Sequence, residues 1–437
     1  MTKTTRRRRA KRPEPPPALW LLAPLLLALP LIGVLVVPLS PAEAEMWQRA
    51  VTLRPGPAPL ADGVAALSLR VFGDTLLALR VPGVAALALL LLILWDDARR
   101  WRLAVLASAP LLVWGALAEP MALAAAVPLA VMARLADGAL AEKVTKKAPM
   151  RAGPWVLAGA AGSVAALLDP AGVVALAVIL LALGAGPRPR GAVFAAAGAV
   201  PLLLALALWW AATDPPAVPP MPLSAVALAL LGLGPLVLWA LWPVDGAWRA
   251  RAALLLIGIT VAAALLGRGT MLFPMLALVL LVPVAAARIE TVRAAWAAAM
   301  TPVFAIGLIG VSGLYALYGA GLPAAADPFA SDRMRPAFCS EILLALEEEG
   351  AVALAAQQTE PLRPCLWQGN LAETPILAPT VGALATAPGP VLLVAFWPDD
   401  GAALARRLGG AERIGERAVP GHLDVEQRFT LWRIEQP

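Results

Sequence analysis

The stretch Leu19–Leu39, LWLLAPLLLALPLIGVLVVPL, contains no charged residue and therefore points to a membrane protein. At about 1.5 Å per residue, a helix of this length crosses the roughly 30 Å apolar core of a bilayer. The stretch is longer than the apolar region of a cleaved secretory signal, and the PLSPAEA sequence at its end makes a poor cleavage site. We interpret it as a retained first membrane span.

The composition of the whole chain supports this interpretation. Of its 437 residues, 60% are hydrophobic and 15% are charged, and the mean hydropathy is +0.77. These values exclude an ordinary soluble protein and predict an α-helical polytopic membrane protein with about 11 transmembrane helices. The predicted spans are 19–39, 77–95, 103–118, 120–133, 154–168, 171–186, 191–211, 222–243, 252–266, 270–287 and 298–319.

The basic residues predict the orientation of these spans. With the basic N-terminus, residues 1–18, placed inside, 21 of the 35 Lys and Arg residues fall on the inner side and 5 fall in outer segments before residue 319. Positive charge marks cytoplasmic loops, so this distribution explains the net charge of +6 without a nucleic-acid partner. The arginine- and alanine-rich composition is typical of bacteria. We therefore expect a multi-pass protein of the bacterial inner membrane with an extracytoplasmic, periplasmic C-terminus.

The C-terminal segment changes character. We divide the chain into the basic N-terminus, a transmembrane domain at 19–323 with a first outer loop at 40–76, and a small α/β domain at 324–437. In the last of these, periodicity predicts a helix over Ser340–Gly350 and a buried strand over Pro390–Trp397. A second helical piece, DDGAALARRLGG, and an alternating strand, Gln427–Arg433, follow.

The cysteines and the histidine give little indication of chemistry. Cys339 and Cys365 both fall in the C-terminal domain, where they form either a disulfide, contributing about 3 kcal/mol, or two buried thiols. His422, the single histidine, is interpreted as a structural or surface residue. The sequence contains no CxxC, zinc-ligand spacing or P-loop, so no cofactor is identifiable, and nothing supports a divalent metal.

Ionisable residues gather on the predicted outer face. They are Glu43, Glu45, Asp62, Asp74, Glu119, Asp169 and Asp214, accompanied by Arg54, Arg80 and Arg268. Charges near membrane depth are costly, and carboxylates beside arginines suit a site that binds a phosphate and moves a proton. The alternative is structural, since Glu119-Pro120 and Asp169-Pro170 also suit turns between short helices.

The first outer loop predicts two helices. Ser40, Pro41 and Glu43 form the S-x-x-E pattern of a capping box, so Glu43 has a structural as well as a catalytic interpretation. Glu45 and Arg49 are spaced for an i,i+4 ion pair. We expect Trp47 to be an interfacial anchor rather than a sugar platform.

The second helix of this loop shows an apolar stripe. Leu60, Val64, Leu67 and Val71 recur at helical spacing, and Gly73 supplies a stop. The pattern predicts a helix that lies in the outer membrane interface between the first two spans.

Residues 40–95 resemble the N-terminal part of the membrane-embedded glycosyltransferases with the C-type fold, the group that contains protein O-mannosyltransferases and the lipid A aminoarabinose transferase. The resemblance rests on the sequence segments AEA at 42–44, PAPL at 57–60, LRVFGD at 69–74 and LRVP at 79–82. In that family a first-loop Asp-Glu pair follows span 1. Ala42 stands here where the aspartate would be.

The resemblance implies a polyprenyl-phosphate-linked sugar donor and a lipid, glycan or protein acceptor. It makes Glu43 the first and Glu45 the second candidate for the base that activates the acceptor. Arg80 and Arg268 are the candidates for binding the donor phosphate, and Arg54, Asp62, Asp169 and Glu119 are further candidates for substrate binding. Membrane lipids are the other expected partners.

Three hypotheses follow. The first is an active glycosyltransferase, and the second is an inactive relative that serves as a scaffold or a lipid-linked-sugar binder in envelope assembly, which the replacement by Ala42 supports. The third is a transporter or flippase, for which we would expect internal repeats and charges at mid-membrane depth. The sequence shows neither feature.

Overall fold

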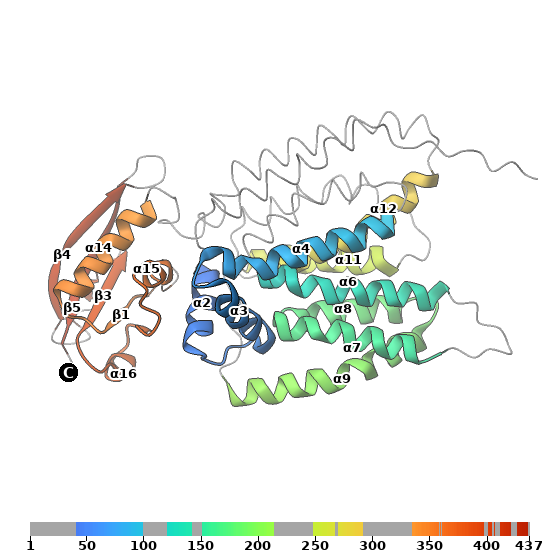
Figure 1. The fold of residues 1–437 in the computed structure, drawn as a ribbon, viewed down its shortest axis with the longest axis horizontal. Helices are drawn as coiled ribbons and strands as arrows, with labels where there is room; N and C mark the ends of the chain where they lie inside the picture. The colour runs from blue at the N-terminus through green and yellow to red at the C-terminus, as the bar shows by residue number, and fades with distance from the viewer. Residues whose placement is uncertain are drawn as a thin grey trace, which may run out of the picture.

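The structure is a computed structural model that describes residues 41–98, 120–141, 151–213, 248–266, 270–291, 334–357, 359, 361–396, 401–403, 406, 411–420 and 426–435. Most of these residues belong to a helical bundle, and the last hundred or so build a sheet beside one end of it (Figure 1). The predicted spans 19–39, 103–118, 222–243 and 298–319 lie outside the described residues.

Seven helices of the bundle coincide with predicted spans. They are α4 (Leu76–Ala98), α6 (Pro120–Ala141), α7 (Gly153–Leu168), α8 (Gly172–Gly184), α9 (Pro189–Ala212), α11 (Trp248–Leu265) and α12 (Leu272–Thr291). In the described part of the chain, α4, α6, α9 and α11 are long and apolar enough to cross a membrane. The membrane class and helical character are thus confirmed, and the count of about 11 stays a prediction.

The bundle packs closely around α12. Every side chain from Met271 to Val282 is buried. Gly159 of α7 lies against the backbone of Ala195 in α9, and Gly198 of α9 lies against the backbone of Val156, so a Cβ at either glycine would collide with main-chain atoms. Small residues at such crossings allow the close helix approach that stabilises membrane bundles.

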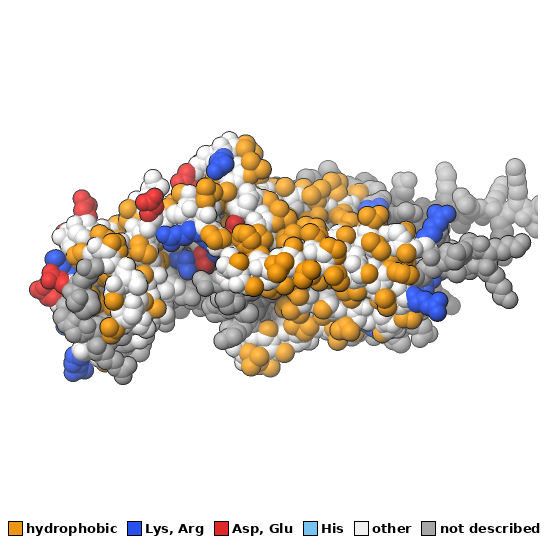
Figure 2. Space-filling model, turned by 90° about the horizontal axis from the view of Figure 1, so that it is seen from below, with side chains coloured by type: hydrophobic (Ala, Val, Ile, Leu, Met, Phe, Trp, Pro, Cys, Tyr) orange, Lys and Arg blue, Asp and Glu red, His pale blue; other side chains and the backbone are white. Residues whose placement is uncertain are grey.

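Helix α6 is longer than the predicted span 120–133. The prediction ended where charged residues begin, but the helix continues to Ala141 and carries Asp137 to the far end of the bundle. There Asp137 accepts a hydrogen bond from Trp248 Nε1 at 2.8 Å and lies 2.8 Å from Arg249 Nε. Figure 2 shows Lys and Arg side chains gathered at this end, away from the sheet.

Two short helices, α2 (Pro41–Thr52) and α3 (Pro59–Phe72), lie across the opposite end of the bundle (Figure 1). The predicted helix and its stop are confirmed, because α3 ends at Gly73, whose φ of +81° favours glycine. Ala61, Ala65, Ser68 and Leu69 face the protein.

The C-terminal part forms a mixed sheet of β1 (Ala353–Ala355), β2 (Ile376–Leu377), β3 (Val391–Phe396), β4 (Ala411–Pro420) and β5 (Glu426–Ile434), in the order β2-β1-β3-β5-β4. The first three strands are parallel, and β5 runs antiparallel to both its neighbours. Helices α14 (Met334–Glu348) and α15 (Arg363–Gln368) cover one face, and the short α16 (Val381–Leu384) covers the other.

One helix and two strands of this domain lie where the sequence predicted them. The predicted helix is the C-terminal part of α14, which stops before Gly350 at φ +58°, and both predicted strands lie at β3 and β5. Strand β3 is buried on both faces, as its unbroken apolar run indicated. Most of the DDGAALARRLGG segment lies outside the described residues.

Helix α15 and the residues after it dock on α2. Gln48 Nε2 donates hydrogen bonds to the carbonyl oxygens of Ala372 at 3.0 Å and Thr374 at 3.2 Å. Ala372 and Trp367 also pack in one apolar cluster with Met46 of α2. Contacts between residues more than 300 apart in sequence therefore join the sheet domain to α2.

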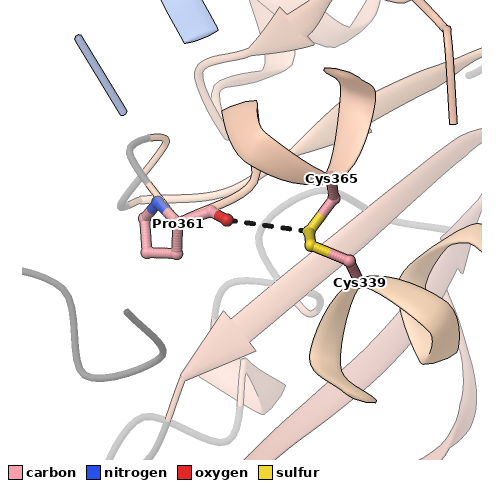
Figure 3. The surroundings of a disulfide bond; sticks show 3 residues. All are labelled: Cys339, Pro361 and Cys365. Atoms are coloured by element: carbon pink, nitrogen blue, oxygen red, sulfur yellow. Dashed lines mark hydrogen bonds between the residues drawn. A yellow bond between two sulfur atoms is a disulfide. The ribbon is translucent and has the colours of Figure 1, made fainter. Parts of the chain in front are cut away.

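A disulfide between Cys339 and Cys365 joins α14 to α15 (Figure 3), which decides between the two states that the sequence left open. The carbonyl oxygen of Pro361 lies 3.7 Å from the Cys365 sulfur. A disulfide sulfur has no proton to donate, so this is a packing contact. Both cysteines are fully buried.

Replacing both cysteines, Cys339→Ser with Cys365→Ser, is expected to destabilise the sheet domain by about 3 kcal/mol, because a cross-link restricts the unfolded chain. Hydrogen exchange of the β1 and β3 amides in the full-length protein should then accelerate about a hundredfold. The control is Leu344→Ser, at an exposed position of α14. Equal exchange in the double variant and the control would contradict the expectation.

Candidate functional site

Two fully buried charges at the end of the bundle beside the sheet form an ion pair. Arg80 Nε donates to Glu43 Oε1 at 2.7 Å, and Arg80 Nη2 donates to Glu43 Oε2 at 3.0 Å. Both side chains are completely inaccessible to solvent. The paired parallel hydrogen bonds are the geometry that guanidinium and carboxylate groups favour.

This pair joins α2 to the first turns of α4. The structure thus brings together Glu43 and Arg80, the acid and the downstream basic partner that the family resemblance suggests. Each charge is neutralised by the other in a region without water, where an unpaired charge would cost several kcal/mol. The helix-capping interpretation of Glu43 depends on Ser40, which lies outside the described residues.

A second, accessible network surrounds Glu45. Its Oε1 is 2.7 Å from Arg49 Nη1, as the i,i+4 spacing predicted, and its Oε2 is 3.5 Å from Arg363 Nη2 of α15. Arg49 Nε also donates to Asp62 Oδ1 at 3.0 Å. The Glu45 side chain is 41% exposed, so an incoming molecule can reach its carboxylate. The Glu43 side chain is fully buried and cannot be reached in this way.

The turn between α2 and α3 is bound to the end of α9. Trp209 Nε1 donates to the Gly56 carbonyl and Trp210 Nε1 to the Pro57 carbonyl, each at 2.8 Å. Gly56 itself lies against the side chains of Arg49 and Asp62, and a Cβ there would collide with both. The turn is therefore held from both sides.

Arg54 also lies on this turn. Its residue is exposed, and its backbone N–H donates to the Arg49 carbonyl at 3.1 Å.

The expectation that Trp47 anchors the membrane interface is wrong. Its side chain has 0% exposure and packs in the apolar cluster between α2, α3 and α4. Its Nε1 donates to Asp74 Oδ1 at 2.7 Å, so the polar atom of the indole is satisfied inside the protein. Because α2 lies between the bundle and the sheet domain, its tryptophan is enclosed instead of reaching lipid.

Asp169 occupies the turn between α7 and α8. Its Oδ1 accepts from the Ala171 N–H at 2.8 Å, as a turn residue does, and its carboxylate also accepts a hydrogen bond from Thr270. Burial raises the pKa of Asp169 to about 6, and the two hydrogen bonds oppose that shift only in part. The carboxyl can therefore take up or release a proton near neutral pH.

The remaining predicted residues divide into two groups. Asp62 belongs to the Glu45 network, whereas Glu119 and Arg268 lie outside the described residues. Among the described residues, no group of three His, Cys, Asp or Glu side chains is arranged to hold a metal ion.

Sequence reasoning missed Arg363, Thr270 and the pair Trp209-Trp210. Only the tryptophans carried a local signal, because paired tryptophans at the end of a span are typical of an interface.

Two solved structures share the fold of this chain. They are crystal structures of ArnT from Cupriavidus metallidurans, one in the apo state and one bound to undecaprenyl phosphate. The identities are 12% and 14% and the TM-scores 0.58 and 0.54, and each match covers 95% of this chain and 98% of ArnT. No protein-family model and no curated relative matches the sequence.

These matches establish the fold. ArnT is a lipid A aminoarabinose transferase of the C-type fold, so the resemblance inferred from residues 40–95 is confirmed at the level of architecture over nearly the whole chain.

The Glu43–Arg80 pair generates a stability prediction. Glu43→Gln removes the buried carboxylate charge that accepts from Arg80 Nε and Nη2 and should destabilise the folded protein by about 3–5 kcal/mol, measured as loss of the folded fraction in a detergent-unfolding titration. Glu45→Gln, in the exposed network, should cost about 1 kcal/mol or less. Comparable losses in the two variants would show that burial of the pair does not govern stability.

Asp169 generates a pH prediction. Its pKa is raised in the folded state, so its contribution to stability is present below about pH 4 and is lost as the pH rises through about 6. Asp169→Asn keeps an acceptor oxygen and removes the charge, so it should raise the melting temperature more at pH 7.5 than at pH 4. Glu412→Gln, on an exposed edge strand, serves as the control. A pH-independent effect of Asp169→Asn would overturn the assignment.

Proposed function

We propose that this chain is an integral-membrane glycosyltransferase that takes a sugar from a polyprenyl-phosphate carrier and transfers it to an acceptor on the side of its C-terminal domain. The observation that carries the proposal is the full-length match to ArnT, which includes a structure with undecaprenyl phosphate bound. The proposal places the protein in the bacterial inner membrane, with the arginine-rich end of the bundle in the cytoplasm and the sheet domain in the periplasm.

The reaction needs two kinds of group. The acceptor oxygen or nitrogen forms a bond to the anomeric carbon while the bond from that carbon to the phosphate oxygen breaks, and polyprenyl phosphate leaves. A carboxylate must take the acceptor proton, and cations must stabilise the negative charge that develops on the phosphate. The outer end of the bundle supplies carboxylates and arginines together.

The candidate bases differ in how far their carboxylates are exposed to solvent, and we rank them by this exposure. Glu45 is partly exposed at the junction of α2 and α15, whereas both oxygens of Glu43 are bound by Arg80 away from solvent. We therefore place Glu45 ahead of Glu43 as the base and assign Glu43 the role of holding Arg80. Asp169, whose pKa is about 6, is the second candidate base because its proton affinity suits a transfer near neutral pH.

The proposal also names the residue that binds the donor phosphate and the class of the acceptor. Arg268 remains the proposed phosphate-binding residue, whereas Arg80, as inaccessible as Glu43 and bound to it, is assigned to holding the buried pair. The acceptor is a lipid, a glycan or a protein. A second function, a lipid-linked-sugar binder without turnover, is favoured by Ala42 at the position of the family's first acid and by the enclosure of Glu43.

The test uses purified protein in lipid nanodiscs with undecaprenyl-phosphate-linked sugars and a panel of lipid, glycan and peptide acceptors. Mass spectrometry follows the release of undecaprenyl phosphate and the mass gain of the acceptor. Glu45→Gln or Asp169→Asn should lower turnover at least about a hundredfold while donor binding persists, since loss of a general base typically costs 10²–10⁴-fold. Glu412→Gln, on the exposed edge strand β4, should match the wild type.

The outcomes separate the hypotheses. Turnover that depends on one of the two carboxylates supports the enzyme and identifies its base. Donor binding without turnover in the wild type supports the binding protein. Absence of both binding and turnover overturns the proposal.

A further inference from the structure

The turn between α2 and α3 supplies few hydrogen-bond donors of its own. It has the sequence LRPGPA at 53–58, and Pro59 then begins α3. Proline has no N–H group, so this stretch has few donors for its own carbonyl oxygens. Leu53 also has a φ of 53°, a backbone conformation that a leucine seldom adopts. Such a turn keeps one conformation where the surrounding structure holds it.

Two successive tryptophans at the end of α9 hold this turn. Trp209 Nε1 donates to the Gly56 carbonyl and Trp210 Nε1 to the Pro57 carbonyl, each at 2.8 Å and each across 153 positions of the sequence. Both tryptophans are partly buried. Because two neighbouring carbonyls are bound by two neighbouring side chains, both the position and the orientation of the turn are fixed.

Helix α9 presents the tryptophans from a fixed place in the bundle. Its Gly198 lies against the backbone of Val156 in α7, and Gly159 of α7 lies against the backbone of Ala195 in α9. A helix in main-chain contact with its neighbour cannot shift without losing that packing. The turn is therefore held relative to the membrane bundle and not only to its own loop.

The turn also contacts the network around Glu45. Gly56 is buried against the Asp62 carboxylate and the Arg49 guanidinium, with no room for a Cβ. Arg49 Nε donates to Asp62 Oδ1 at 3.0 Å, and its Nη1 lies 2.7 Å from Glu45 Oε1. The Arg49 guanidinium thus lies between the turn and Glu45, so a displacement of Gly56 would displace it.

We propose that Trp209 and Trp210 are positioning residues for Glu45. Through the turn at Gly56 they fix Arg49, and Arg49 fixes the carboxylate of Glu45 at the junction of α2 and α15. A general base acts only within hydrogen-bond reach of the acceptor proton, so a small displacement of the base lowers the rate of the chemical step. The inference rests on the proposed function, because it takes Glu45 as the base of that reaction.

The first test measures the geometry of the network without any activity. Full-length protein in nanodiscs is treated with a water-soluble carbodiimide and an amine, and peptide mass spectrometry follows the modification of Glu45 and Asp62. Trp209→Phe with Trp210→Phe keeps two aromatic rings and removes both donors. It should raise the modification rate of Asp62, whose side chain is 12% exposed, about tenfold, because a lost hydrogen bond frees the turn. Gly56→Ala should do the same with both tryptophans in place.

Two substitutions are matched controls. Trp248→Phe removes an indole donor that lies 2.8 Å from Asp137 at the other end of the bundle. Gly63→Ala adds a methyl group to α3 where the described part of the chain has no atom within 4 Å of it. Both controls should keep the wild-type modification rates. Control-like rates in the double tryptophan variant and in Gly56→Ala would overturn the inference.

The second test measures turnover with the undecaprenyl-phosphate-linked sugars and acceptors, expressed per folded protein. The double tryptophan variant and Gly56→Ala should each lower kcat about a hundredfold and leave the KM for the donor unchanged, because a misplaced base slows the chemical step and not donor binding. Trp248→Phe should retain the wild-type kcat. Wild-type kcat in both test variants would overturn the positioning role. A wild type without turnover would count against the proposed function, and the modification rates would then decide whether the tryptophans hold the network.

Discussion

The ion pair between Glu43 and Arg80 is the interaction on which the end of the bundle beside the sheet domain depends. Both side chains are inaccessible to solvent, and each charge is compensated by the other, which is bonded to it in a fixed orientation. The pair sets the position of α2 relative to the start of α4. A helix that is not itself a span is thereby held at a defined angle across the bundle end.

The placement of α2 in turn positions the remaining parts of the site. One side of α2 encloses Trp47, and another presents Glu45 and Gln48 to the sheet domain. The disulfide then holds α15 against α14, so that Arg363 and the docking carbonyls approach α2 from a rigid unit. Segments distant in the chain meet at one network, and the helices α2, α3 and α15 that carry its side chains give it a fixed geometry.

Apolar pattern and turn chemistry were sufficient to predict much of the fold. The seven bundle helices that coincide with predicted spans, α3 with its stop at Gly73 and the strands β3 and β5 lie where the apolar pattern indicated. The short strand β1, the six-residue α15 and the last residues of α6 around Asp137 were not predicted, because their limits depend on neighbours distant in the chain. Trp47 was assigned to the interface because a local pattern does not show what will cover it.

The sequence by itself determined the membrane class, the end of the bundle where acids and arginines gather, and the apolar stripe of α3. These properties depend on composition and on spacing along the chain, because these decide which surfaces are apolar and where the charged residues lie relative to the membrane. Only the tertiary structure decided which carboxylate is enclosed by Arg80, which stays open beside Arg363, and that the two cysteines are bonded. Those outcomes depend on distances between residues far apart in sequence, which are set when burial forces each charge and each polar atom to find a partner.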